Sequence, residues 1–336
     1  MTIQDRRAIK YSAVQALNTA PGNPKITVLV YTAGSAVLAL LLSVISMMLG
    51  NRISNTGGLS NIGLRSILST AQSVLPLLQI LISFCLGLGY DSAALKMARR
   101  QEATPRTLLD GFLLFGPLMR SLLLLGLIYL SIGFGAMYAA SFIFMMSPFS
   151  GDFYELMEPL LTSTTILSSE VVMDDATLMA AAQALLPMIP IFLVIFAAVA
   201  TPIMYQYRMV NFCLIDASRP RALIAMRDSI NMMRKNKLQL FKLDLSFWWF
   251  YLAQLVISLT AYGDILLPLL GVIFPWSDTV SFYLFYVVSL VLQIALYYLC
   301  LNKVQVAYAT AYEALRPQPQ EPQSQGVPLG NIFDMR

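Results

Sequence analysis

Long apolar runs separated by shorter polar segments set the pattern of this chain of 336 residues. A helix rises 1.5 Å per residue, so about 20 apolar residues cross the roughly 30 Å of hydrocarbon in a bilayer. The runs lack the alternation of polar and apolar positions that a membrane barrel strand shows, which leaves helices as the way to satisfy the backbone in lipid. The sequence therefore predicts an all-α, polytopic transmembrane helix bundle over 26–315, with about six spans at 26–49, 67–88, 119–146, 182–205, 245–267 and 282–300.

Composition points to the same class. Apolar residues make up 57% of the chain and charged residues only 12%, whereas about 25% of the residues in a soluble domain are charged. The mean hydropathy is +0.68, and a single soluble core does not hide that much apolar surface. The net charge of +4 is too small for a nucleic-acid footprint, so no nucleic-acid partner is expected.

The charged residues predict how the chain is threaded through the membrane. Lys and Arg gather in the segments 1–25, 96–106 and 209–242. The loop 148–179 has six acidic residues and no Lys or Arg. Because Lys and Arg concentrate in cytoplasmic loops, we expect both termini to be cytoplasmic and 148–179 to be extracytoplasmic. Arg52 and Arg65, between the first two spans, depart from this pattern.

The two terminal segments outside the spans have patterns of their own. Residues 1–25 predict a cytoplasmic amphipathic helix on the inner membrane surface, with Ile9, Ala13, Ala16 and Leu17 on one face; the alternative is a frayed tail. The Pro- and Gln-rich segment 316–336 predicts a disordered tail.

The segment 209–242 predicts a basic cytoplasmic helix. Ser218 is a candidate N-cap, Pro220 suits the first turn, and the apolar stripe expected on this helix consists of Leu223, Met226, Ile230 and Met233. We expect anionic inner-leaflet lipids to contact it, with the bundle or a partner protein as the alternative.

Several absences argue against an enzyme. The chain has no histidine, which removes the commonest general base and the Ser–His and Cys–His pairs. Its three cysteines have no Cys-x-x-Cys spacing, and Gly87-Leu88-Gly89 lacks the context of a dinucleotide site and indicates close helix packing. The acidic loop 148–179 has no spacing typical of a metal site, and a solvated face is the favoured interpretation. We expect no catalytic residue, cofactor or metal.

Ionisable residues at the edges of spans are candidate functional positions, because a charge is costly to bury in lipid. The candidates are Asp110, Arg120, Asp244 and Lys303. One interpretation is structural: interfacial ion pairs that fix the helices, with Asp244 accepting hydrogen bonds or pairing with a cation such as Lys303 or Arg208. The other is a substrate or proton route.

The segment 225–250 joins a Met-rich basic helix to the run Leu-Asp-Leu-Ser-Phe and a Trp pair. This pattern resembles the signature of the bacterial integral membrane protein family "domain of unknown function 975". The signature positions are filled by Ser229, Met233, Lys237, Phe241, Asp244, Ser246 and Phe247. Weaker similarities to the family lie at Asp110-Gly111-Phe112 and at 308–316. The chain departs from the family pattern in two places: residues 201–203 read Thr-Pro-Ile in place of Pro-Gly-Ile, and the insertion 148–179 is long.

The resemblance implies a multi-pass protein of a bacterial plasma membrane and supplies no catalytic residue. We carry two hypotheses for its function. The favoured one is a non-enzymatic accessory protein that docks a membrane-protein partner, such as a transporter or an envelope-biogenesis complex, through its basic cytoplasmic face. The alternative is a small transporter or export factor with a route through the bundle.

Overall fold

Helices are the only regular elements among the residues that the computed structural model describes, which are 6–55, 62–151, 154–155, 183, 185–260, 262 and 278–316. Five helical stretches are long and apolar enough to cross a membrane, and a sixth is counted if one bent helix pair forms a single span. The all-α, polytopic fold class is thereby confirmed, and the chain is a multi-pass membrane protein that contacts the lipid bilayer.

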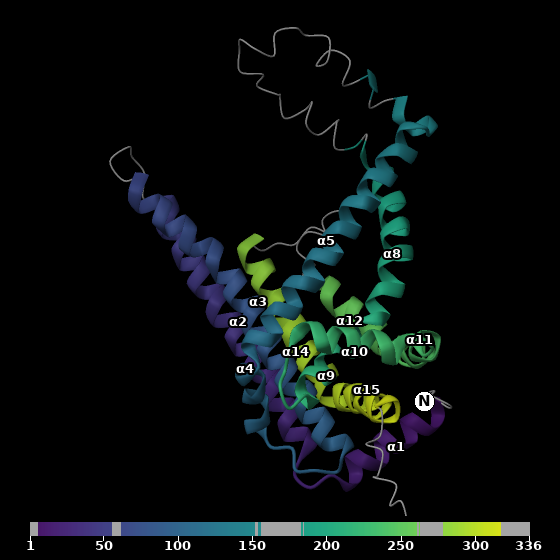
Figure 1. The fold of residues 1–336 in the computed structure, drawn as a ribbon. Coiled ribbons are helices and arrows are strands. Elements are labelled where there is room, and N and C mark those ends of the chain that lie inside the picture. The colour runs from purple at the N-terminus through teal and green to yellow at the C-terminus, as the bar shows by residue number, and fades with distance from the viewer. Residues whose placement is uncertain are drawn as a thin grey trace, which may run out of the picture. The chain divides into compact units, whose positions relative to one another are not determined.

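The helices that carry the spans are α2 (Pro24–Asn55), α3 (Ile62–Ala98), α5 (Phe115–Met145), α8 (Met188–Gln206) and α14 (Asp278–Leu296) (Figure 1). The bent pair is α11 (Lys237–Leu245) and α12 (Trp248–Thr260), whose axes differ by 63°. The fifth predicted span, 245–267, thus starts at a break in the helix, and its last residues lie outside the described part of the chain. Pro76 is accommodated inside α3 and Pro202 inside α8.

The chain divides into two compact units. Unit 1 comprises residues 1–41, 93–105 and 242–336, and unit 2 comprises 42–92 and 106–241. Each unit combines parts of spans with shorter helices that flank them.

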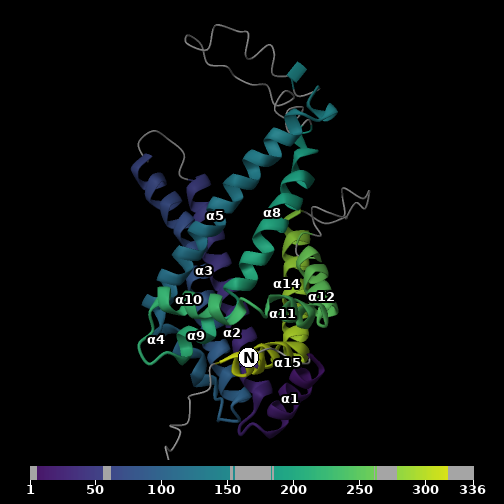
Figure 2. The same ribbon diagram turned by 45° about the vertical axis from the view of Figure 1, so that its right-hand side comes forward.

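Helix α15 (Asn302–Leu315) forms the core of unit 1 and follows α14 through a π-helical turn, Tyr297–Leu301. It buries apolar side chains along most of its length, including Val306, Ala307 and Ala311. The N-terminal helix α1 (Arg6–Thr19) packs along α15 (Figure 2) and buries Ile9, Ala13 and Ala16. The amphipathic face predicted for residues 1–25 is therefore covered by protein in this unit.

In unit 2 the spans α5 and α8 run side by side (Figures 1 and 2). Two short helices follow α8, namely α9 (Val210–Asp216) and α10 (Ala222–Met233), and α10 packs against α9, α5 and α8. The N-cap of α10 is Arg221, in extended conformation, and not Ser218 as predicted. The buried face of α10 consists of Ala222, Ala225, Met226, Ser229 and Met233.

Two glycines allow the end of α3 to touch the segment that follows it. This segment contains a 3₁₀ turn (Pro105–Leu109) and α4 (Asp110–Leu113). A Cβ atom on Gly89 would lie 1.9 Å from the carbonyl oxygen of Leu108, and one on Gly111 would lie 1.9 Å from that of Cys85. Both contacts are with backbone, which cannot move aside as a side chain does. The close packing predicted for Gly87-Leu88-Gly89 is confirmed at Gly89 and is not found at Gly87, where a Cβ would meet nothing within 4 Å.

Replacing Gly111 by alanine is expected to destabilise the fold by about 3 kcal/mol or more, because overpacking against backbone forces the helices apart. The measurement is thermal unfolding of the purified protein in detergent. Gly116→Ala is the matched control: a Cβ there meets nothing within 4 Å, and the better helix propensity of alanine should leave stability equal or higher by about 1 kcal/mol. Equal melting of the two variants would contradict the packing argument.

Candidate functional site

The break between α11 and α12 gathers the largest set of signature residues in unit 1. Asp244 lies in the last turn of α11, and Ser246 and Phe247 form the break itself. The hydroxyl of Ser246 donates to the carbonyl oxygen of Leu243 at 2.6 Å, and this local bond favours ending the helix. Phe247 is buried and anchors the turn.

Lys10 from α1 binds this break. Its Nζ donates a hydrogen bond to the carbonyl oxygen of Ser246 at 3.0 Å and lies 4.1 Å from the centroid of the Phe247 ring. A cation suits this place, because the C-terminal end of a helix carries partial negative charge and free carbonyls, and the ring face attracts it as well. Burial lowers the pKa of Lys10 from its usual value, and the charge of neighbouring Arg6 lowers it further.

Asp244 is held by α15. The hydroxyl of Tyr308 donates to Asp244 Oδ1 at 2.5 Å, and the Tyr308 and Tyr251 hydroxyls are themselves hydrogen-bonded. Tyr308 is buried. The sequence suggested hydrogen bonds or a cation for Asp244; the structure supplies a tyrosine hydroxyl. The chain Asp244–Tyr308–Tyr251 ties α11, α12 and α15 together.

Unit 1 has further polar ties at the ends of its helices. Arg99 forms an ion pair with Glu313, with 2.6 Å between Nη2 and Oε1, and at this partial exposure it contributes no more than about 1 kcal/mol. Asn302 Nδ2 donates to the carbonyl oxygen of Pro24 at 2.8 Å, which joins the start of α15 to the start of α2.

A second polar cluster lies in unit 2, around the buried side chain of Asp91 in α3. Asn211 Nδ2 donates to Asp91 Oδ2 at 2.8 Å, and Arg208 interacts with the same carboxylate electrostatically. The neighbouring Ser92 hydroxyl donates to Asp110 Oδ2 at 3.4 Å. Helix α3 is thus bound to both α9 and α4 just past the predicted end of its span.

Ser229, the first signature residue, joins α10 to the end of span α8. Its hydroxyl donates to the carbonyl oxygen of Gln206 at 2.8 Å and accepts the backbone N–H of Met209 at 3.2 Å. Gln206 is the last residue of α8, so this carbonyl has no partner within its own helix. A hydroxyl that donates and accepts at once satisfies both backbone groups of the turn.

The four candidate positions are divided between the two units. Asp110 belongs to the Asp91 cluster in unit 2, and Asp244 belongs to the network around α15 in unit 1. Arg120 and Lys303 are exposed, on α5 and α15 respectively. Of the remaining signature residues, Met233 is fully buried, Lys237 is half-buried and Phe241 is partly exposed, with its ring edge-on to Tyr205 at a centroid distance of 6.0 Å.

Sequence reasoning missed four important residues, namely Lys10, Asp91, Asn211 and Tyr308 as the partner of Asp244. Asp91 had a detectable signal, since it is an acid placed directly after an apolar run. The other three are ordinary polar residues whose importance comes from distant partners.

In the described part of the chain, no group of three or more His, Cys, Asp or Glu side chains is placed to hold a metal ion. Most of the acidic loop 148–179 lies outside the described residues.

Removing the Tyr308 hydroxyl is expected to destabilise the protein. Tyr308→Phe takes the donor from Asp244 and the partner from Tyr251, a loss of about 1–3 kcal/mol for partly buried groups. Thermal unfolding in detergent measures it. Asp244→Asn, which keeps an acceptor oxygen, should cost less than Asp244→Ala, and Tyr262→Phe on an exposed ring is the control. Additive losses for Tyr308→Phe and Asp244→Ala in the double variant would contradict a direct bond.

Comparison with known proteins gives one match. The profile of a family described as "Protein of unknown function (DUF975)" matches residues 1–318. Neither the comparison with curated proteins nor that with solved structures gives a match. The family match covers nearly the whole chain, including both units and the resemblance noted at 225–250. The chain belongs to the DUF975 family.

Proposed function

We propose that this protein is a non-enzymatic accessory protein of the bacterial plasma membrane that docks a membrane-protein partner through the exposed side of α1. The observation that carries the proposal is the division of α1 into two faces. Ile9, Ala13 and Ala16 are buried in unit 1. The opposite side presents a stripe, hereafter the α1 stripe, of Arg7, Tyr11, Val14 and Asn18.

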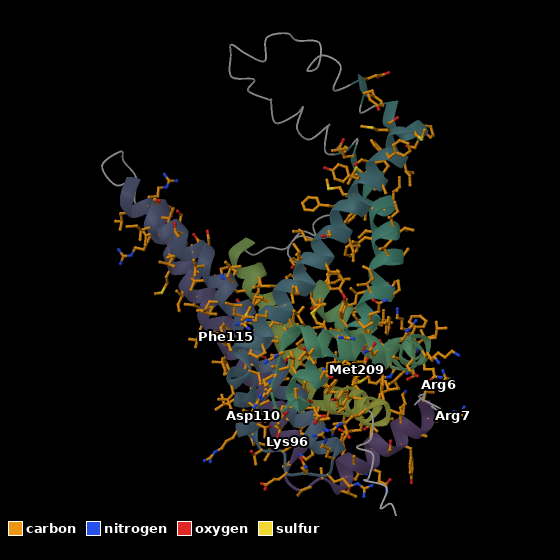
Figure 3. The ribbon with its side chains drawn as sticks, in the orientation of Figure 1. Arg6, Arg7, Lys96, Asp110, Phe115 and Met209 are labelled. Carbon is orange, nitrogen blue, oxygen red and sulfur yellow. The ribbon has the colours of Figure 1, made fainter. Side chains whose placement is uncertain are left out.

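The character of the α1 stripe favours a protein partner over lipid. The face that would enter a bilayer is already used against α15, and the remaining side is polar apart from Tyr11 and Val14. Tyr11 is 75% exposed, and Arg6 and Arg7 extend from the N-terminal end of the helix (Figure 3). Tyrosine and arginine are the side chains that protein interfaces favour as binding anchors.

The way α1 is held also supports docking. Lys10 fixes the helix to the break between α11 and α12, and α15 supports it along its length. A surface that is rigid before binding loses less conformational entropy when a partner arrives. The contacts of Lys10 and Asp244 hold α1, α11 and α15 together. The α1 stripe lies on the exposed side of this support.

A transport route is less well supported. Transporters place polar and ionisable groups near the bilayer midplane. The polar contacts of Lys10, Ser229, Asp244 and Asn302 are made at helix ends and breaks, and Asp91 lies past the predicted end of its span at residue 88. Within the predicted spans 245–267 and 282–300, Gln254 donates to the Tyr297 hydroxyl at 3.1 Å, a pairing that also serves as ordinary helix–helix contact.

The proposal includes a topology with both termini and α10 in the cytoplasm and the acidic loop outside, from the distribution of Lys and Arg. The test uses single-cysteine variants at Tyr154 and Ser218, both exposed, in a background without Cys85, Cys213 and Cys300. A membrane-impermeant maleimide should label position 154 in intact spheroplasts and position 218 only after lysis. Labelling of position 218 in sealed cells would contradict this orientation.

The docking proposal is tested by photocrosslinking in native membranes. A benzoylphenylalanine side chain at Tyr11 or Val14 should give discrete adducts of higher mass, while one at Ala314, exposed on α15, is the matched control. The double change Arg7→Gln with Tyr11→Ala should reduce isolation of the crosslinked partner about tenfold or more, since truncating a central anchor typically costs about 2 kcal/mol or more. Adducts no stronger at 11 and 14 than at 314 would overturn the assignment of this surface.

A further inference from the structure

Helix α10 presents an unusual exposed side. Its buried face is made of small or flexible side chains, while two large apolar residues point the other way: Leu223 is 69% exposed and Ile224 48% exposed. The single apolar stripe predicted for this helix is therefore divided, because Met226 and Met233 are buried while Leu223 is exposed. On α11, Leu238 is exposed to a similar extent, 74%.

Both helices are fixed at the end of a membrane span. Ser229 binds α10 to the last carbonyl of α8, and Figures 1 and 2 show α10 lying crosswise at that end of the span. Phe241 of α11 packs edge-on against Tyr205, the next-to-last residue of α8. A side chain held at the end of a span lies at the depth of the lipid headgroups.

Cations surround the exposed apolar residues. Arg219, Arg221, Arg227, Arg234 and Lys235 are all exposed, and Asp228 is the one acid among residues 219–241. Large apolar side chains interspersed with Arg and Lys are the composition of helices that lie in the membrane interface, where the apolar groups enter the acyl boundary and the cations meet phosphate. The α1 stripe differs in charge, since Arg7 is its one cation.

We propose that this surface, hereafter the basic elbow (Arg219, Arg221, Leu223, Ile224, Arg227, Arg234, Lys235 and Leu238), binds acidic phospholipid headgroups of the inner leaflet. Charge complementarity selects the lipid class, because the surface carries five cations against Asp228. The apolar residues supply the second attraction that stable interfacial binding requires. This interaction is independent of the docking surface on α1.

Spin labels on the full-length protein test the placement of the basic elbow. Labels at Ile224 and Leu238, in the cysteine-free background and in nanodiscs containing phosphatidylglycerol, should collide with oxygen far more than with a water-soluble nickel chelate, as a label at Leu130 in span α5 does. A label at Asn18 on α1 is the aqueous reference. Collision ratios at 224 and 238 equal to that at Asn18 would overturn the proposal and leave the elbow as a protein-binding surface.

Lipid selectivity tests the role of the cations without replacing cysteines. Native mass spectrometry of the detergent-purified protein with an equimolar mixture of phosphatidylglycerol and phosphatidylcholine should show preferential retention of the acidic lipid. The triple change Arg227→Gln, Arg234→Gln and Lys235→Gln should lower that preference tenfold or more, since each cation near an anionic surface contributes about fivefold. The control Arg6→Gln, Lys25→Gln and Lys303→Gln removes equal charge at exposed positions outside both proposed surfaces and should keep the lipid preference within about twofold. Equal losses in both variants would overturn the assignment to the elbow.

Discussion

A helix that ends or bends at a membrane surface leaves backbone carbonyls without partners, and satisfying them is the constraint on which the rest of this structure depends. Two contacts satisfy such carbonyls directly. Ser229 donates to the carbonyl of Gln206 at the end of α8, and Lys10 donates to the carbonyl of Ser246 at the break before α12. In each case the donor comes from a flanking helix, so satisfying the backbone also fixes that helix in place.

Those two contacts explain why the flanking helices present the surfaces they do. Because Lys10 and α15 hold α1 by its buried face, the α1 stripe is what remains exposed. Because Ser229 holds α10 through the middle of its inner face, Leu223 and Ile224 are directed away from unit 2. The first surface combines the polar residues Arg7 and Asn18 with Tyr11 and Val14, and the second mixes large aliphatic and cationic residues. This difference in composition is why we propose a protein partner for the first surface and an acidic lipid surface for the second.

The fold class and the number of spans could be predicted from the sequence, because length and hydropathy are local properties that lipid imposes on each segment separately. The break in the fifth span could not, since residues 245–267 read as one apolar run. The helix is interrupted at Ser246 and Phe247, and the break is bound by Lys10, which is 236 residues from Ser246 in sequence. The apolar stripe predicted for α10 is only partly a single face, because Met226 and Met233 are buried beside the small residues Ala222, Ala225 and Ser229 while Leu223 is exposed.

The signature residues take on a physical meaning once these contacts are known. Ser229 joins α10 to a span end, Asp244 joins α11 to α15 through Tyr308, and Ser246 and Phe247 form the break that Lys10 binds. The hydroxyls of Ser229 and Ser246 donate to backbone carbonyls, and the carboxylate of Asp244 accepts from Tyr308. Tyr308 itself lies in the segment 308–316, whose resemblance to the family was noted separately from the signature. The hydrogen bond to Asp244 shows that the two similarities describe one joint, which a sequence can record only as two unrelated motifs.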